Sequence, residues 1–133
     1  MSQLTAPRDT PKYGANAIPD FLFDFTVEAG SSVYQGSIVG LNAAGNAVPA
    51  TAVDCKVVGV AQETKHSGER VRVRQGCHRF ANAAGQGHVS KPMVGSACFV
   101  ADDQTVAAQG SVKAGTIVGV DDAGVWVQFL LGS

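Results

Sequence analysis

The chain has 133 residues, 45% of them hydrophobic, and its ten lysine and arginine residues nearly balance eleven aspartate and glutamate residues. This length predicts a single domain, and the formal charge of −1 provides no global field to attract nucleic acid or an anionic membrane. The apolar residues are mostly small, with 19 alanines and 19 valines against one tryptophan. We therefore expect modest hydrophobic stabilisation of the monomer and a gain in stability from self-association.

The sequence suggests no targeting signal and no cysteine motif. Charges between Arg8 and Asp24 interrupt any apolar run that a signal peptide would need, and no stretch resembles a membrane-spanning helix. We expect a protein that is kept in the cytosol or leaves the cell by lysis. The spacings of Cys55, Cys77 and Cys98 match no zinc or redox motif, so reduced, buried thiols are expected.

Residues 1–32 are predicted to form an extended N-terminal arm, because several prolines lie there in a polar stretch without helical periodicity. At the end of the arm, phenylalanines at every second position predict a strand with aromatic rings on one face. This strand could belong to the core of its own subunit or dock across a subunit boundary, and the pattern favours neither. The arm residues expected to contact another subunit or a partner are Pro7, Pro11, Tyr13, Ile18, Phe21, Phe23 and Phe25.

Residues 33–133 are predicted to form one all-β domain, a small barrel or sandwich of short antiparallel strands. A turn pattern, Asn or Asp followed three residues later by Gly, occurs at 42–45, 82–85 and 121–124. Valine-rich segments flank these turns, so each is expected to be a hairpin tip. Helix is expected only as a single turn around 89–94, where Pro92 limits it.

An internal echo predicts two similar β units inside this barrel. The segment 36–39 leads on to 57–60 in the same way that 95–98 leads on to 117–120, which aligns Gly59 with Gly119. The copies are short, so we interpret them as repetition within one barrel.

Candidate catalytic and metal-binding groups are few and scattered. Cys77 and His78 are adjacent, but neighbours on a strand point to opposite faces, so they cannot act as nucleophile and base. His66, His78 and His88 could share a metal, although solvated imidazoles are the plainer interpretation. The acid pairs at 102–103 and 121–122 lie at predicted turns, where Asp is favoured for backbone reasons. No cofactor and no small-molecule substrate is expected.

The most informative charge pattern is the alternation of Arg70, Arg72 and Arg74 with two valines, which puts three guanidinium groups on one strand face. This face could be solvated, with Glu63 or Glu69 nearby, or it could meet a protein partner. Nucleic acid ranks last, because no aromatic residues interleave with the arginines. Tyr34 and Trp126 lie in predicted strands and are expected to pack.

The order and spacing of several segments resemble the capsid cement, or head decoration, proteins of tailed bacteriophages. The resemblance covers about residues 33 to 129, and the segments that carry it are 34–42, 48–52, 57–61, 71–76, 80–82, 101–107, 114–120 and 125–127.

This resemblance implies a β-barrel protein on the outer surface of an icosahedral head, assembled in the bacterial cytoplasm. Such proteins commonly sit as homotrimers over three-fold positions and brace the major capsid protein, and they bring no catalytic residues. Two other function classes remain open from the residues. One is a glycan- or protein-binding β module of a phage tail or adhesin, and the other is a small hydrolase that uses Cys77 or His88.

Overall fold

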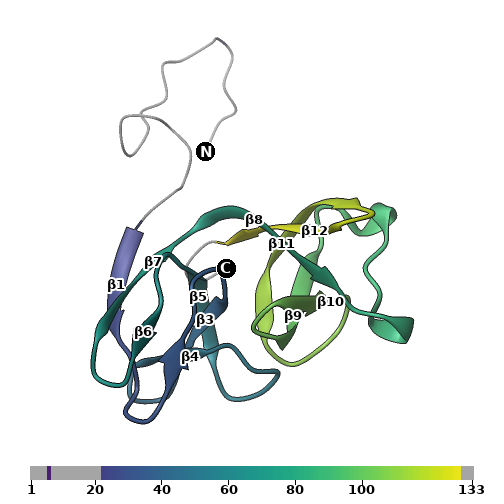
Figure 1. Cartoon of the computed structure of the whole chain (residues 1–133). Helices are drawn as coiled ribbons and strands as arrows, with labels where there is room; N and C mark the ends of the chain where they lie inside the picture. Colours follow the sequence, from purple (N-terminus) through teal and green to yellow (C-terminus); the bar gives the residue numbers. More distant parts are fainter. Residues whose placement is uncertain (1–5, 7–21, 130–133) are drawn as a thin grey trace.

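The computed structural model describes Ala6 and residues 22–129, and strands dominate the described part (Figure 1). Two short 3-10 helices, η1 (Gly85–Gly87) and η2 (Lys91–Met93), interrupt it. The second lies within the expected turn around 89–94 and contains Pro92, whereas η1 was not expected. The strands, in chain order, are β1 (Leu22–Thr26), β2 (Ser32–Val33), β3 (Ile38–Leu41), β4 (Ala47–Pro49), β5 (Lys56–Ala61), β6 (Lys65–His66), β7 (Arg70–Arg74), β8 (Gly76–Asn82), β9 (Ala97–Asp102), β10 (Thr105–Ala107), β11 (Lys113–Asp121) and β12 (Gly124–Phe129).

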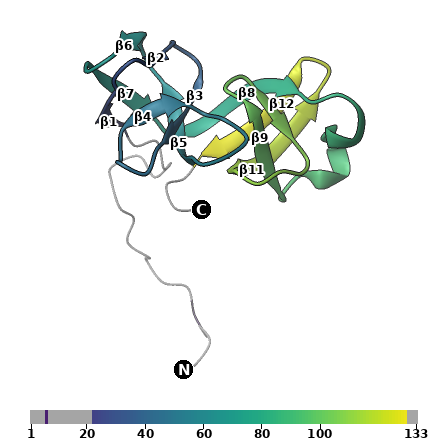
Figure 2. The same cartoon turned by 90° about the horizontal axis from the view of Figure 1, so that it is seen from below.

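The strands divide into two groups that lie side by side, with β8 following β7 across the junction (Figures 1 and 2). The first lobe, residues 22–74, has a sheet in the order β1-β7-β5-β3-β4 and a small β2-β6 pair. The second lobe, residues 76–129, is a closed barrel in the order β10-β8-β12-β11-β9. The predicted fold class, all-β with a small barrel or sandwich of short antiparallel strands, is confirmed, and the barrel contains one parallel pairing, between β10 and β8.

The folded part begins at Leu22, ahead of the expected boundary at residue 33. Strand β1 pairs along its whole length with β7, from Leu22 opposite Arg74 to Thr26 opposite Arg70. The end of the predicted arm is therefore a strand of the first lobe. The rest of the arm, including Pro7, Pro11, Tyr13, Ile18 and Phe21, lies outside the described residues.

Alternating side chains explain why these segments are strands. In β7, Val71 and Val73 are fully buried, while Arg70 and Arg72 face solvent. In β12, Val125 and Val127 are fully buried on either side of the exposed Trp126. A period of two puts one face of each strand in the core.

A shared core joins the two lobes. Residues Ile38, Ala50 and Val60 belong to the first lobe in sequence, but they pack in the same apolar cluster as Phe80, Phe129 and their neighbours in the second lobe. A separate cluster around Val39, Val71 and Val73 fills the first lobe. The backbone N–H of Ile38 also donates to the carbonyl of Asp103 in the second lobe, at 2.8 Å. Ile38 thus ties β3 to the barrel of the other lobe.

The two lobes repeat the same strand pairing. In the first lobe, the N–H of Gly36 donates to the carbonyl of Ala61 at 2.9 Å; in the second, that of Gly95 donates to the carbonyl of Ile117 at 2.8 Å. Antiparallel neighbours also agree, since β3-β5-β7 corresponds to β9-β11-β12. Strand β1, which pairs with β7, corresponds to β8, which pairs with β12.

The register of this repeat differs from the one expected. A Cβ atom placed on Gly59 would lie 2.6 Å from the carbonyl oxygen of Arg74, and one on Gly115 would lie 2.3 Å from that of Gln128. Gly115, rather than Gly119, is therefore the counterpart of Gly59. The two β units also do not form one barrel, because the five main strands of each lobe pair only among themselves.

Two of the three predicted hairpin tips are confirmed. The pattern at 42–45 joins β3 to β4, and that at 121–124 joins β11 to β12. The pattern at 82–85 is not a hairpin, because the side chain of Asn82 both accepts from the N–H of Val89 and donates to its carbonyl, each at 2.8 Å. Asn82 thereby ends β8 and holds the loop that carries η1 and η2.

Candidate interaction surfaces

The arginine row lies on the outer face of the first lobe, as the alternation predicts. The Nη2 of Arg70 lies 2.5 Å from Oδ1 of Asp24, and the Nε of Arg72 lies 3.1 Å from Oε1 of Glu63. Hydrogen bonds from these guanidinium groups lower the pKa values of Asp24 and Glu63. Arg74, at the end of the row, is half-buried. Internal carboxylates thus already meet the first two arginines.

Strand β1 is the last strand in the order of the first lobe's sheet, and a parallel bridge from Val27 to Ala47 follows it. Phe23 and Phe25 lie opposite the buried Val73 and Val71 of β7. Phe25 packs against the first-lobe cluster, whereas Phe23 is 37% exposed. A hollow of about 380 Å³ lies along this edge, lined by Phe23, Asp24, Phe25 and Arg72. Phe25 therefore fits the interpretation of a core strand, while Phe23 presents a partly exposed aromatic ring at the sheet edge.

Cys77 and His78 point to opposite faces of β8. The Nε2 of His78 lies 3.0 Å from the carbonyl oxygen of Gln75, and its ring packs near that of Phe129 with centroids 6.1 Å apart. Cys77 is exposed on the outer face, and partial burial raises the pKa of its thiol. A raised pKa lowers the thiolate fraction at neutral pH, which is the opposite of what an activated nucleophile needs.

The other two cysteines differ in environment. Cys98 is fully buried in β9, and burial raises its pKa to about 11. Cys55 is half-buried and lies beside β3, where a Cβ on Gly40 would come within 2.8 Å of its Sγ. Full burial, expected of all three thiols, therefore holds for Cys98 alone.

The candidate metal ligands make separate local contacts. His66 Nδ1 lies 2.9 Å from Ser32 Oγ, and His88 Nδ1 lies 3.1 Å from the carbonyl oxygen of Ala83. Asp102 accepts a hydrogen bond from the N–H of Gln104, in the turn role predicted for these acids. Within residue 6 and residues 22–129, no group of three or more His, Cys, Asp or Glu side chains is placed to hold a metal ion.

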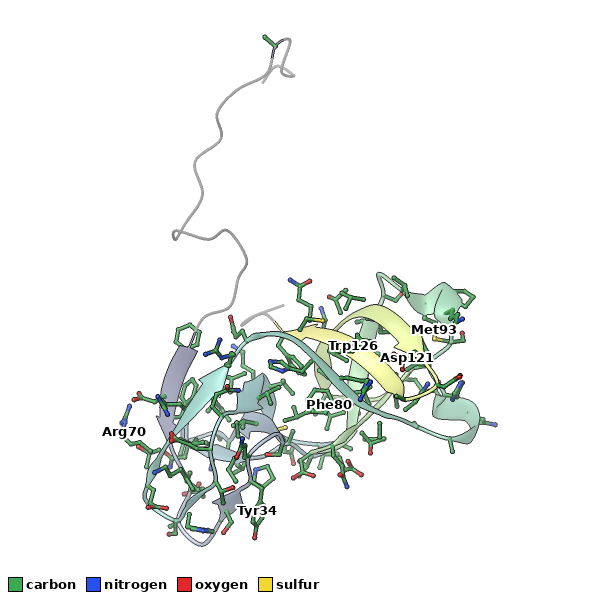
Figure 3. All side chains as sticks on the ribbon, turned by 45° about the horizontal axis from the view of Figure 1, so that its top comes forward. Tyr34, Arg70, Phe80, Met93, Asp121 and Trp126 are labelled. Carbon is green, nitrogen blue, oxygen red and sulfur yellow. The ribbon has the colours of Figure 1, made fainter. Side chains whose placement is uncertain are left out.

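Trp126 is the surface residue that sequence reasoning missed. Its indole Nε1 donates to Oδ2 of Asp121 at 3.0 Å, and the guanidinium carbon of Arg79 lies 5.5 Å from its ring centroid. The residue is 38% exposed. Figure 3 shows Trp126 and Asp121 together on the β11–β12 hairpin. The indole hydrogen bond, together with backbone N–H donors in the turn, lowers the pKa of Asp121. Alternation with two buried valines was the signal that places Trp126 outward.

Tyr34, also expected to pack, is 59% exposed just after β2, with its ring edge against that of His66. It lies in the first lobe, and Trp126 lies in the second, so the two aromatic residues form separate surface features (Figure 3).

A second hollow, of about 530 Å³, lies at the tip of the β11–β12 hairpin. Its polar lining includes Asn82, His88, Lys91, Asp121 and Asp122. Cys77 is not among its lining residues, so the hollow does not bring together the two groups considered for hydrolysis.

Comparisons of the chain with protein-family models, with curated proteins and with solved structures found no match. In the part of the chain that the structure describes, no helix has the length and apolar character needed to cross a membrane.

Proposed function

We propose that the chain is a capsid cement protein of a tailed bacteriophage. In this proposal it binds the outer surface of an icosahedral head as a homotrimer, contacts the major capsid protein, and is assembled in the bacterial cytoplasm. Support comes from the sequence resemblance, whose segments form β3, β5, β7, β11 and β12, the strands that build both lobes. The proposal assigns no catalytic residue and no nucleic acid, membrane or small-molecule ligand.

The observation that carries the proposal is the position of strand β1 in the first lobe. Strand β1 is the last strand in the order of its sheet and Phe23 is 37% exposed on it, whereas the chain just after β1 is bridged to β4 through Val27 and Ala47. An exposed sheet edge is a template for a strand from another chain, with neighbouring hollows taking side chains. Residues 1–21, which precede this edge directly, are proposed to lie along a neighbouring subunit in the same way.

The stabilising mechanism is based on symmetry and linkage. A trimer presents three copies of each weak contact to a lattice of matching symmetry, and the effective concentration of the second and third contacts makes removal slow. Binding that favours the expanded, assembled shell stabilises that shell against the pressure of packed DNA.

Deletion of residues 1–20 tests the arm. We expect the truncated chain to keep its far-ultraviolet circular dichroism, because the described strands begin at Leu22, and to co-sediment less with heads that lack the protein. Head decoration equal to that of the full chain would contradict the role of the arm. Mass measurement in solution and imaging of decorated heads test the trimer and its lattice position.

Substitution of Phe23 by Ser tests the edge without removing a strand. We expect head binding to fall about tenfold, since an aromatic anchor is lost from a contact. Tyr34→Ser is the matched control, because Tyr34 is an exposed aromatic residue of the same lobe that lies away from β1. Equal losses in the two variants would argue against the edge.

The hollow at the β11–β12 tip favours a second candidate function, a glycan-binding module of a phage tail. Amide, imidazole, ammonium and carboxylate groups line it together, and Trp126 lies on the same hairpin. Binding on a glycan array, without binding to heads, would favour this function over capsid decoration.

A further inference from the structure

The repeated pairing of the two lobes makes their outer faces comparable position by position. In the first lobe, β1 and β7 place Asp24 opposite Arg72; in the second, β8 and β12 place Arg79 opposite Trp126. Arg72 and Trp126 are each flanked by two buried valines of their own strand, so they occupy the same place in their lobes. A difference between them therefore reflects chemistry and not backbone position.

The first-lobe face is internally neutralised. Asp24 meets Arg70 and Glu63 meets Arg72, with side chains of both arginines about three-fifths exposed, at 62% and 59%. Exposed ion pairs of this kind cost little to keep in water and contribute little to stability. The guanidinium groups of Arg70 and Arg72 are therefore already paired with carboxylates of their own lobe and hydrated by solvent.

The second-lobe face has a different composition. Around Trp126 it presents Cys77, Arg79 and Ala81 on β8 and Val118 on β11, and Val118 is 43% exposed. Trp126 lies beside Gly119, the residue opposite it on β11. The centres of protein interfaces are enriched in tryptophan and arginine and depleted of other charged residues, as this face is.

Arg79 indicates the chemistry of the occupant. Neither ion pair among the described residues includes Arg79, and its guanidinium lies against the face of Trp126. The nearby Asp121 carboxylate accepts hydrogen bonds from the indole N–H and two backbone N–H groups of its turn, and the positive charge of Arg79 helps to lower its pKa without forming an ion pair with it. A guanidinium that lies against an exposed indole and makes no direct ion pair within the described residues complements a carboxylate that lies beside an apolar side chain.

We propose that the outer face of β8, β12 and β11 around Trp126 and Arg79 is the surface by which the second lobe docks on a protein that presents a carboxylate next to an apolar side chain. This inference rests on the proposed function, which makes that protein the major capsid subunit. The first lobe then contributes its sheet edge, and the two lobes meet the lattice through different chemistry. The arginine row at Arg70 and Arg72 is the solvated counterpart of this surface.

Trp126→Ala is expected to weaken binding to heads that lack the protein about tenfold or more, while Tyr34→Ala, which removes an exposed aromatic residue of the first lobe that lines neither hollow, changes it no more than about threefold. Arg79→Glu is expected to weaken binding as strongly as Trp126→Ala, because it places like charges together. Circular dichroism and a thermal melt establish that each variant is folded.

A footprint on the unmodified chain gives a second measurement that needs no variant. Hydroxyl-radical oxidation of Trp126, the one tryptophan, followed by mass spectrometry, is expected to fall severalfold when the chain is bound to heads.

Each remaining outcome has a distinct meaning. If the unmodified chain does not bind heads, the proposed function fails. If it binds while Trp126→Ala and Arg79→Glu bind equally well and Trp126 oxidation is unchanged, the docking surface is wrong and the proposed function stands. If Trp126→Ala changes the oligomeric mass in solution, the face is a contact between copies of the chain, which also overturns the inference.

Discussion

Asp121 holds the β11–β12 turn and Trp126 at the same time. Its Oδ1 accepts hydrogen bonds from the N–H groups of Ala123 and Gly124, at 2.8 and 3.0 Å, and its Oδ2 accepts that of Trp126. These donors favour the ionised carboxylate, which is why the pKa of Asp121 is lowered from 3.8, with the indole as the largest cause. The geometry of the turn and the position of Trp126 thus both depend on the Asp121 carboxylate.

A pH titration tests this dependence. Because the pKa of folded Asp121 is lowered, the stabilisation by its hydrogen bonds is present above the ordinary Asp range and is lost as pH falls through the lowered value. We expect the indole N–H signal of Trp126 in nuclear magnetic resonance to shift with a midpoint below 3.8. Asp121→Asn should abolish this transition, and Asp122→Asn should leave it. A midpoint at or above the ordinary value would contradict the assignment.

At single positions, alternation along a strand predicted whether a side chain points inward or outward, but not which residues it contacts. The outward arginines and inward valines of β7 are explained by a period of two. The same rule applied to β12 places Trp126 outward, yet its place in a predicted strand favoured packing. The partners Arg79 and Asp121 come from another strand and a turn, so only the strand pairing reveals them.

Pairs of strands show a second device, a glycine that lets two backbones approach. Gly59 and Gly115 occupy equivalent positions, and in both a Cβ would fall closer than 3.0 Å to a carbonyl oxygen of the neighbouring strand, that of Arg74 or Gln128. The same irregularity in register occurs between β3 and β5 and between β9 and β11. The glycine is therefore part of how each lobe curves.

Gly115→Ala and Gly119→Ala distinguish the two possible registers of the repeat. At Gly115 the new methyl group must push β11 and β12 apart, so we expect a loss of about 1–3 kcal/mol in the free energy of unfolding. At Gly119 the nearest atom is a Trp126 side-chain carbon at 3.5 Å, an ordinary contact, so the loss should be smaller. Denaturant unfolding measures both. A larger loss at Gly119 would contradict the structural register.

Elements were predicted best where a turn and two valine-rich segments agreed. The tips at 42–45 and 121–124 met both conditions and are hairpins. The pattern at 82–85 has the same turn residues, but it leads into a loop with η1 and η2, so Asn82 bonds Val89 instead of closing a tight turn. Local turn chemistry cannot distinguish these cases, because the next strand decides which partner the Asn side chain finds.

For the whole molecule, the sequence indicated repetition but not two pairing systems. The short glycine-containing segments at 36–39 and 95–98 do occupy equivalent places, yet the second halves of the repeat are offset. Sheet membership depends on long-range pairing, such as β1 with β7, which no local pattern specifies. The shared core is equally non-local, since Ile38 and its neighbour Val39 face different clusters.

Ile38 makes the two lobes one cooperative unit, and its substitution tests this. It is fully buried among residues of the second lobe, so Ile38→Ala should cost about 2–5 kcal/mol and expose that lobe's core. Trp126 fluorescence reports on the second lobe and circular dichroism on both, and we expect the two denaturant transitions to coincide in the unmodified chain. Ile38→Ala should shift the fluorescence transition although the residue lies in β3 of the other lobe.

Val39→Ala, which trims the first-lobe cluster, is the control for a change confined to that lobe. If the fluorescence midpoint ignored Ile38→Ala, or if the unmodified chain showed two separate transitions, the lobes would be independent domains and the docking contacts of each would have to be strong enough alone.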